Sequence, residues 1–365
     1  MNEAGIISRV RTKIRDIKAY KVKELDYDVI KVDKNENPYD LPQDLKKEIL
    51  EYALERSWSR YPPIVAQELY KKIAEYAGWT PDGIIAGNGA DEMILTILLS
   101  FLEPGMKLVI PVPSFPMYPY IATLIGADVV EVPMNKDFTF DYDALENTFL
   151  KEGNALAICS PNNPTGTLFP LDRLENILEK TDAPVIVDEA YYEFSRITVL
   201  ELLKTYDNLI IIRTFSKGFS FAGLRVGYAL MDPELAVEIG KVKMPFNINI
   251  FSIAAASKLL ENRTEIENTQ KEIVKERDSL FEALNSINGL TVYPSSANFI
   301  LFKTPYESDI VYGKILEDGV LVRNLSANPL LKNTLRITVS KPDDNKKFID
   351  SLTRVMGELR KRQKG

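Results

Sequence analysis

A lysine that follows a short apolar run is the first residue in this sequence that could carry out chemistry. Lys217 lies in the segment TFSKGF at positions 214–219, after the apolar run 209–212. Because its neighbours are aromatic or small, we expect the amine to be partly removed from water, which would lower its pKa and make it a nucleophile or a Schiff-base partner. The simpler alternative is a surface lysine on a turn. Arg225 follows eight residues later and could bind an anion or form an ordinary ion pair.

Asp188, like Lys217, follows a short apolar run. Asp188 ends the sequence VIVD at 185–188, so we expect it at the carboxyl end of a buried strand. A buried carboxylate needs a cationic partner. A protonated pyridine nitrogen would serve, and it would let the pyridine ring act as an electron sink. The alternative is an aspartate that caps the following turn.

Two turns rich in proline and glycine complete this group of segments. Residues 160–166 (SPNNPTG) follow the apolar run 156–159, and the rigid turn would direct the Asn163 amide inward, toward a phenolic oxygen. Residues 87–92 (GNGADE) lead into a helix whose free N–H groups could bind an anion. The second segment is neither a dinucleotide fingerprint nor a P-loop. Turn formation or helix capping could explain each segment alone.

The composition excludes several kinds of catalytic site. The sequence has no histidine and one cysteine, Cys159, which rules out imidazole catalysis, Cys/His zinc sites and an internal disulfide. The chemistry must therefore use Lys, Asp, Glu, Tyr, Ser or a cofactor, and we expect no metal site. The net charge of −7 argues against nucleic acid or a membrane as partners. No apolar run reaches the ~18 residues of a membrane span, and the basic N-terminal segment is no signal peptide. We expect a cytoplasmic protein.

Alternating strands and helices must position these residues. We expect strands at 107–112, 127–132, 155–160, 184–188, 209–214 and 225–231, with helices at 90–102, 114–125 and 171–180. This alternation is typical of an α/β fold, in which a mostly parallel sheet has helices on both faces. Ligands bind such sheets at the carboxyl ends of the strands, and the segments described above lie there.

The pattern changes after residue 246. A long helical region at 250–287, with an early break, precedes strands at 290–292, 298–302, 320–323 and 334–340 and a closing helix at 344–361. The chain of 365 residues is long enough for two domains. We predict an N-terminal arm at 1–34 that packs with the small domain, a large domain at 35–246 and a small α+β domain at 247–365.

The order of these segments resembles that of the fold-type I pyridoxal-phosphate (PLP) enzymes, the aspartate-aminotransferase superfamily. The resemblance covers essentially the whole chain and implies that fold, with a seven-stranded, mostly parallel sheet in the large domain. Within the superfamily, several segments are similar to those of the histidinol-phosphate aminotransferases: NENPY at 35–39, RYP at 60–62, GNGADE at 87–92, DEAYYEF at 188–194, MPFN at 244–247 and LRIT at 335–338.

The resemblance implies a role for each candidate residue. Lys217, Asp188 and Tyr191 are the implied catalytic residues, with Lys217 holding PLP as a Schiff base and Asp188 on its pyridine nitrogen. Tyr191 and Asn163 would contact the phenolic oxygen, and Phe115 would stack on the ring. The implied contacts of the cofactor phosphate are Gly89, Ala90, Asp91, Thr214, Ser216, Arg225 and, from the neighbouring subunit, Tyr61. The implied contacts of the substrate are Asn37, Arg323 and Arg336.

These roles imply an aminotransferase that acts on a small amino donor and a 2-oxo acid. We predict transfer from histidinol phosphate to 2-oxoglutarate, in histidine biosynthesis, by a homodimer with shared active sites. An aromatic amino-acid aminotransferase and a PLP-dependent decarboxylase of a phosphorylated amino acid stay open, because two arginines suit a phosphate but one suits a carboxylate equally well. A non-catalytic protein on this fold would be expected to have lost Lys217, Asp188 or Arg225, and all three are present.

Overall fold

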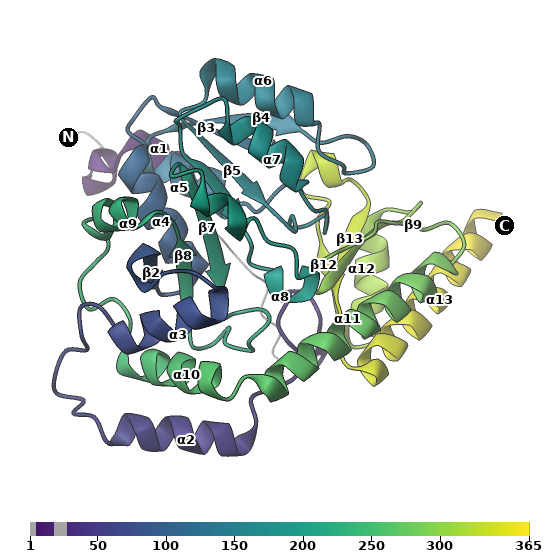
Figure 1. Cartoon of the computed structure of the whole chain (residues 1–365). Coiled ribbons are helices and arrows are strands. Elements are labelled where there is room, and N and C mark those ends of the chain that lie inside the picture. Colours follow the sequence, from purple (N-terminus) through teal and green to yellow (C-terminus); the bar gives the residue numbers. More distant parts are fainter. Residues whose placement is uncertain (1–4, 18–27, 365) are drawn as a thin grey trace.

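A seven-stranded sheet forms the centre of the large domain in the computed structural model, which describes residues 5–17 and 28–364 (Figure 1). Strand β8 runs antiparallel to its neighbours β2 and β7, and the other neighbouring pairs are parallel. The predicted mostly parallel sheet is therefore confirmed. In spatial order the strands are β2 (Ile84–Gly87), β8 (Gly227–Leu230), β7 (Leu209–Thr214), β6 (Val185–Asp188), β5 (Ala155–Cys159), β3 (Lys107–Val112) and β4 (Asp128–Pro133).

Alternation along the buried strands explains why helices lie on both faces of this sheet. In β6, Val185 and Val187 join one apolar cluster and Ile186 joins another, because successive residues of a strand point to opposite faces. The first cluster contains residues of α2 (Gln43–Leu54), α3 (Gln67–Ala77), α6 (Tyr142–Glu152), α7 (Leu171–Leu178) and α10 (Ile250–Glu261). The second contains residues of α4 (Ala90–Phe101), α5 (Met117–Ile125) and α9 (Pro233–Gly240).

The small domain packs three helices against a second sheet. Figure 1 shows α11 (Thr264–Asn285) running from the large domain across to the small one, beside α13 (Pro342–Lys364). Helix α12 (Ser308–Glu317) completes the layer. The α+β arrangement is the one predicted. In spatial order the strands are β12 (Arg323–Asn324), β13 (Thr334–Thr338), β10 (Phe299–Lys303) and β9 (Thr291–Val292), and all neighbours are antiparallel.

The N-terminal segment contacts both domains. Arg11, just before α1 (Thr12–Asp16), and Lys13, within it, donate hydrogen bonds to main-chain oxygens at the end of α5. Strand β1 (Ile30–Lys31) pairs in parallel with β11 (Val320–Leu321) of the small domain. The bounds of the arm (1–34), of the large domain (35–246) and of the small domain (247–365) stay predictions, and residues 1–4 and 18–27 of the arm lie outside the described part of the chain. The remaining short helices are α8 (Tyr192–Ser195) and four 3-10 turns, Ile6–Arg9, Pro81–Gly83, Leu200–Lys204 and Pro329–Leu331.

Several predicted elements begin or end elsewhere, and for three of them the physical reason is clear. The helix predicted from 114 begins at Met117, because Pro116 disfavours a helical conformation at the residue before it. Strand β8 begins two residues after Arg225, whose φ of 53° is left-handed and cannot continue a strand. The strand predicted at 320–323 is two strands, because β11 pairs with β1 whereas β12 pairs with β13.

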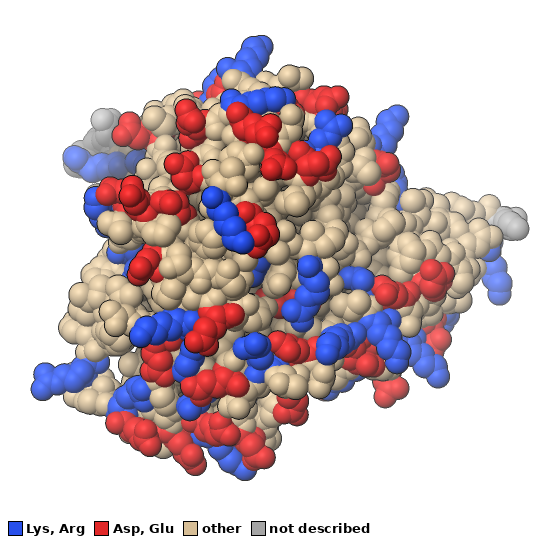
Figure 2. All heavy atoms as spheres, viewed as in Figure 1, with Lys and Arg blue, Asp and Glu red and all other residues tan. Residues whose placement is uncertain are grey.

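The surface carries charges of both signs. On the face shown in Figure 2, lysines and arginines are interspersed with aspartates and glutamates over both domains. None of the described helices combines the length and the apolar composition that a membrane span requires.

Candidate active site

Three neighbouring strands bring the predicted chemical residues to one edge of the large sheet. Asn163 follows β5, Asp188 ends β6 and Lys217 follows β7. These strands are parallel neighbours, so their carboxyl ends meet at the same edge. Arg336, on β13 of the small domain, lies close enough for its charge to act on the pKa values of both Lys217 and Tyr191. The site is therefore formed by both domains.

Lys217 has an amine of reduced basicity. Burial lowers the pKa of this group to about 8, and the positive charge of Arg336 acts in the same direction. The Nζ atom donates a 2.9 Å hydrogen bond to the main-chain oxygen of Lys34. Near pH 7 such a lysine has a larger fraction of neutral amine than an exposed lysine, and the neutral amine is the form that attacks a carbonyl carbon.

Asp188 is a buried carboxyl group that has no basic partner in the described part of the chain. Burial raises its pKa to about 6, although the Ala190 N–H and the Tyr118 hydroxyl donate hydrogen bonds to it at 3.0 and 3.1 Å. Among the residues that the structure describes, no lysine or arginine forms an ion pair with Asp188. A buried carboxylate in this state favours a bound cation. A protonated ring nitrogen fits that requirement.

Polar groups from both domains surround Tyr191. Its hydroxyl accepts a 2.8 Å hydrogen bond from Asn35 Nδ2, and burial raises its pKa to about 12, so it is protonated at neutral pH. Asn163 Oδ1 accepts a 2.6 Å hydrogen bond from Arg336 Nη1. Arg336 also donates through Nη2 to the main-chain oxygen of Asp33 at 2.7 Å. These contacts hold Arg336 and Asn163 in fixed orientations.

The turn before α4 and the Arg225 side chain bring together groups that suit an anion, and we call them the cradle. Gly89, with φ of 81°, precedes Ala90 at the start of this twelve-residue helix, whose first N–H groups have no partner within the helix. A side chain at position 89 would begin 2.5 Å from Arg225 Nη2, so only glycine lets the guanidinium approach. Arg225 contacts Ser216 Oγ at 3.2 Å and Asp91 Oδ2 at 3.3 Å.

Thr214 lies next to Ser216, the residue that contacts Arg225 in the cradle. Its hydroxyl donates to the main-chain oxygen of Val226 at 3.3 Å and accepts from the Ser216 N–H at 3.1 Å. The positive φ of Arg225 is a conformation that costs roughly 1–2 kcal/mol for a residue with a side chain. Such backbone strain is concentrated at functional sites.

Two arginines face each other on the small-domain sheet. Arg323 of β12 and Arg336 of β13 are directly paired residues of an antiparallel ladder, so their side chains leave the sheet on the same face. Like charges in this position destabilise a sheet. An anion that bound both guanidinium groups would offset the repulsion, and a dianionic phosphate suits two arginines.

Three predicted residues have other surroundings. Tyr61 is 81% exposed and stacks on Phe246, with ring centroids 4.5 Å apart. Asn37 donates to the main-chain oxygen of Gly218 at 3.3 Å, so its amide supports the turn that carries Lys217. Phe115 is partly buried at the edge of the apolar cluster that contains α4 and α5.

Sequence reasoning missed Tyr118 and Asn35. Tyr118 lies 70 positions before Asp188, and Asn35 lies 156 positions before Tyr191, so no local spacing links either pair. The available signal for Tyr118 was its place in the first turn of a helix that follows a predicted strand. For Asn35 it was the NENPY segment, in which only Asn37 was singled out.

Comparisons with known proteins identify the family of this chain. Residues 27–352 match the family described as aminotransferase class I and II. A histidinol-phosphate aminotransferase of Chlorobium phaeovibrioides is 37% identical over 98% of this chain and 99% of its own length. Among solved structures, a histidinol-phosphate aminotransferase of Clostridium acetobutylicum has a TM-score of 0.84 with 28% identity, over 90% of this chain and all of that one. Another from Sinorhizobium meliloti, in complex with pyridoxal-5′-phosphate, shares the fold at a TM-score of 0.87, with 22% identity over 96% and 98% of the two chains.

Proposed function

The chain belongs to the class I and II aminotransferases, and we propose that it uses PLP to transfer the amino group of histidinol phosphate to 2-oxoglutarate. One observation carries the proposal: a lysine amine of lowered pKa shares a site with a buried carboxyl group that has no basic partner among the described residues. When bound, PLP supplies an electron sink for the charge that develops at the substrate Cα.

Lys217, Asp188 and Tyr191 form the reacting part of the proposed site. Lys217 would hold the cofactor through Nζ, and its free amine would be the group that takes a proton from the substrate Cα and gives it back. Asp188 accepts the hydrogen bond of the ring N–H and keeps that nitrogen cationic. Tyr191 and Asn163 bond the phenolic oxygen, and Phe115 covers the ring.

The cradle at α4 binds the cofactor phosphate in this proposal. Ala90 and Asp91 offer main-chain N–H groups at the positive end of the helix dipole. The Gly89 N–H donates to the Gly87 carbonyl at 2.9 Å, and Gly89 contributes by letting the phosphate approach the main chain closely. Arg225 supplies the cationic charge. The Asp91 carboxylate is paired with Arg225 Nη2 in this structure, and this ion pair has to break when the phosphate binds Arg225. Thr214 and Ser216 supply hydroxyl groups.

Arg323 and Arg336 bind the anionic group of the substrate. The paired arrangement of two arginines favours the phosphate of histidinol phosphate, and the name shared by the relatives supports the same substrate. We place the reaction in histidine biosynthesis on that ground. Asn37, which already bonds the Gly218 carbonyl, lies at the Lys217 turn and completes the substrate contacts.

We further propose a cytoplasmic homodimer with shared active sites. A group of large apolar side chains on α2, the segment after it and Met244 is exposed: Leu50, Leu54, Trp58, Tyr61, Ile64, Val65 and Met244. Exposed apolar surface of this kind is typical of an interface between protein chains. Tyr61 would then reach the partner's cofactor phosphate. Mixing Lys217→Ala with Tyr61→Asp subunits tests this, since each hybrid would regain one complete site; no recovery in confirmed hybrids would exclude the shared site.

Reduction with borohydride tests the proposed function. The purified protein should absorb visible light as a PLP enzyme, and borohydride should fix a pyridoxyl group on the peptide that contains Lys217. Lys217→Ala should lose at least about a thousandfold in turnover, because it removes the group that moves the proton. If the reduced protein carries no pyridoxyl group on Lys217, the proposed function is wrong.

Substrate kinetics separate the remaining alternatives. An aminotransferase needs 2-oxoglutarate for sustained turnover, whereas a decarboxylase of a phosphorylated amino acid releases carbon dioxide without it. Steady-state kinetics with histidinol phosphate, phenylalanine, tyrosine and O-phosphothreonine should give the highest kcat/KM for histidinol phosphate. A higher value for an aromatic amino acid would assign the chain to that class of donor.

A further inference from the structure

A cluster of buried polar residues lies behind the turn that carries Lys217. We call it the buried ion cluster, and its members are 0–2% exposed apart from the partly buried Tyr76. Arg213 Nη2 and Glu189 Oε2 form an ion pair at 2.8 Å, and the Tyr76 hydroxyl donates to Glu193 Oε1 at 3.1 Å. The charges of Arg213 and Glu193 both act on Tyr228. The members are Glu189, Glu193, Arg213, Tyr76 and Tyr228.

Glu193 touches the residue that follows Lys217. A methyl group on Gly218 would lie 2.5 Å from Glu193 Cβ, 2.6 Å from Cγ and 3.0 Å from Cδ. These distances are far below van der Waals contact, so the Gly218 backbone packs directly on the side of the Glu193 side chain. Since Gly218 is bonded to Lys217, any displacement at this contact also moves the backbone of Lys217.

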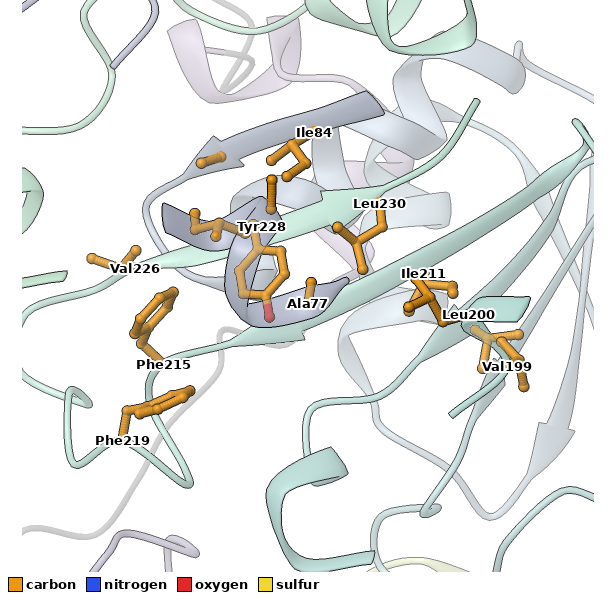
Figure 3. Packing of buried hydrophobic residues seen from close by; sticks show 14 of the residues in the cluster. Ala77, Ile84, Val199, Leu200, Ile211, Phe215, Phe219, Val226, Tyr228 and Leu230 are labelled. Carbon is orange, nitrogen blue, oxygen red and sulfur yellow. The ribbon is translucent and has the colours of Figure 1, made fainter. Parts of the chain in front are cut away.

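Other contacts hold the remaining sides of the turn. The Gly218 carbonyl accepts hydrogen bonds from Gln270 Nε2 at 3.0 Å and from Asn37. Phe219 packs against Phe215 and against Tyr76, with ring centroids 4.9 and 5.2 Å apart. Figure 3 shows the ring of Phe215 between those of Phe219 and Tyr228, and all three belong to the same apolar cluster. The hydroxyl of Tyr76 fixes Glu193 while its ring supports Phe219.

We propose that Glu193 is a positioning residue for Lys217, because its buried side chain forms the wall against which the Lys217–Gly218 peptide packs. The inference rests on the proposed covalent role of Lys217. It assigns Glu193 no contact with cofactor or substrate. Its effect is to fix where the lysine amine emerges into the site, and a shift of about 1 Å at such a group can cost on the order of a hundredfold in rate.

The surroundings of Glu193 suit a carboxyl group that keeps its shape whether or not it is charged. Burial raises its pKa to about 7, and Arg213 opposes that shift. The ionisable groups that face it come from four elements: Tyr76 of α3, Arg213 of β7, Tyr228 of β8 and Arg196 at the end of α8. A glutamine of the same shape should therefore preserve the wall.

Three single variants test the proposal. Glu193→Gln preserves the shape of the side chain that contacts Gly218, and Glu193→Ala removes Cγ and Cδ from that contact. Gly218→Ala adds a methyl group that would clash with the Glu193 side chain. The visible absorbance of the holoenzyme reports the protonation of the bond between Lys217 and the cofactor, and its pH titration is the main measurement. We expect Glu193→Gln to titrate like the wild type. Glu193→Ala and Gly218→Ala should shift the midpoint by at least about 0.5 pH units and lower kcat by roughly tenfold or more, with KM changed less.

The outcomes separate positioning from simple support of the fold. Glu201 is an exposed glutamate on the 3-10 turn Leu200–Lys204, and Glu201→Ala is the control for loss of a carboxylate. If Glu193→Ala fails to fold, Gly218→Ala still decides the matter. Variants that are folded, hold PLP on Lys217 and titrate like the wild type would overturn the inference. Failure of borohydride to label Lys217 in the wild type would instead overturn the proposed function.

Discussion

Asp188 and Glu189 are consecutive buried acids with opposite surroundings. Asp188 contacts Tyr118 and Cys159, which belong to the apolar cluster of α4 and α5, at 3.1 and 3.9 Å. Glu189 points to the other face, where Arg213 pairs with it and the Val199 N–H donates to it at 2.7 Å. Asp188 is the last residue of β6 and Glu189 follows it, with its N–H still bonded to the Ile212 carbonyl of β7, so the alternation of the strand continues and puts the two carboxyl groups on different faces.

This difference in surroundings suggests different roles: Asp188 serves ligand binding, whereas Glu189 serves the stability of the fold. Burial alone would lower the pKa of Arg213, but the negative charge of Glu189 outweighs this effect and raises the pKa above its usual value. The two charges of this pair therefore compensate each other. Asp188 receives hydrogen bonds but no charge of opposite sign from the described residues, and its pKa is raised to about 6. An acid that stays uncompensated in the fold is poised for a cationic ligand.

Replacement of Asp188 by asparagine should have the largest effect on catalysis. The amide has nearly the same shape but cannot keep the ring nitrogen protonated, so we expect kcat to fall on the order of a thousandfold, or about 4 kcal/mol. The stability of the cofactor-free protein should be unchanged or higher, because a buried charge has been removed. Single-turnover kinetics and urea unfolding measure the two effects. Near-normal half-reaction rates would remove Asp188 from its role.

Replacement of Glu189 by glutamine should show the reverse pattern. It leaves the Arg213 charge buried without its partner, which costs about 3–5 kcal/mol when a buried pair is broken. The double variant Glu189→Leu/Arg213→Met removes both charges and should recover most of that loss. Urea unfolding at one fixed protein concentration measures the free energies. A double variant as unstable as the single one would mean that the pair is needed for more than charge compensation.

The two acids should also differ in the pH dependence of stability. Asp188 has a folded-state pKa of about 6 against a usual 3.8, so the folded cofactor-free protein holds a proton that the unfolded chain releases. Its contribution is complete below pH 3.8 and is lost as the pH rises through 6, by at most about 3 kcal/mol. Glu193 titrates over an overlapping range. The difference between wild type and Asp188→Asn in unfolding free energy from pH 4 to 7 therefore isolates Asp188, and parallel curves would contradict the assignment.

Local sequence patterns predicted the parts of the site that depend on strand ends. Asp188, Asn163 and Lys217 each follow a short apolar run, and the parallel sheet brings such ends together. The resemblance added the roles. The first residues of α5 (Met117) and β8 (Gly227) were harder to predict, because single residues, Pro116 and Arg225, determine where these elements begin.

Contacts between distant positions could not be predicted in this way. The pairs Tyr118–Asp188, Tyr76–Glu193 and Glu193–Gly218 join segments 70, 117 and 25 positions apart. Neither spacing nor periodicity encodes them. The first two pairs depend on how α5 and α3 lie on the two faces of the sheet, and the third depends on how α8 packs against the turn after β7. The split between β11 and β12 has the same cause, because it reflects pairing with β1, almost 300 residues earlier.

Tyr118→Phe should have the smallest effect on kcat of these variants. It also tests most directly how the surroundings of Asp188 differ from those of Glu189. Its hydroxyl donates to Asp188 Oδ2, and burial raises the pKa of Tyr118 well above the usual value, so it remains a donor. Loss of a hydrogen bond to a charged group costs about 1.5–3 kcal/mol, of which only the part that differs between ground and transition states appears in the rate. We therefore expect a decrease in kcat of about tenfold and a further rise in the pKa of Asp188.

The apo-protein titration decides whether Tyr118 acts through Asp188. The loss of stability with rising pH should move to higher pH in Tyr118→Phe, because the anionic carboxylate has lost a donor. In Tyr118→Phe/Asp188→Asn the shift should vanish, since no group remains to titrate there. Tyr120→Phe, two positions further along α5, is the matched control for loss of a tyrosine hydroxyl. A Tyr118→Phe variant that is slower but titrates like the wild type would show that the hydroxyl supports packing and not the charge of Asp188.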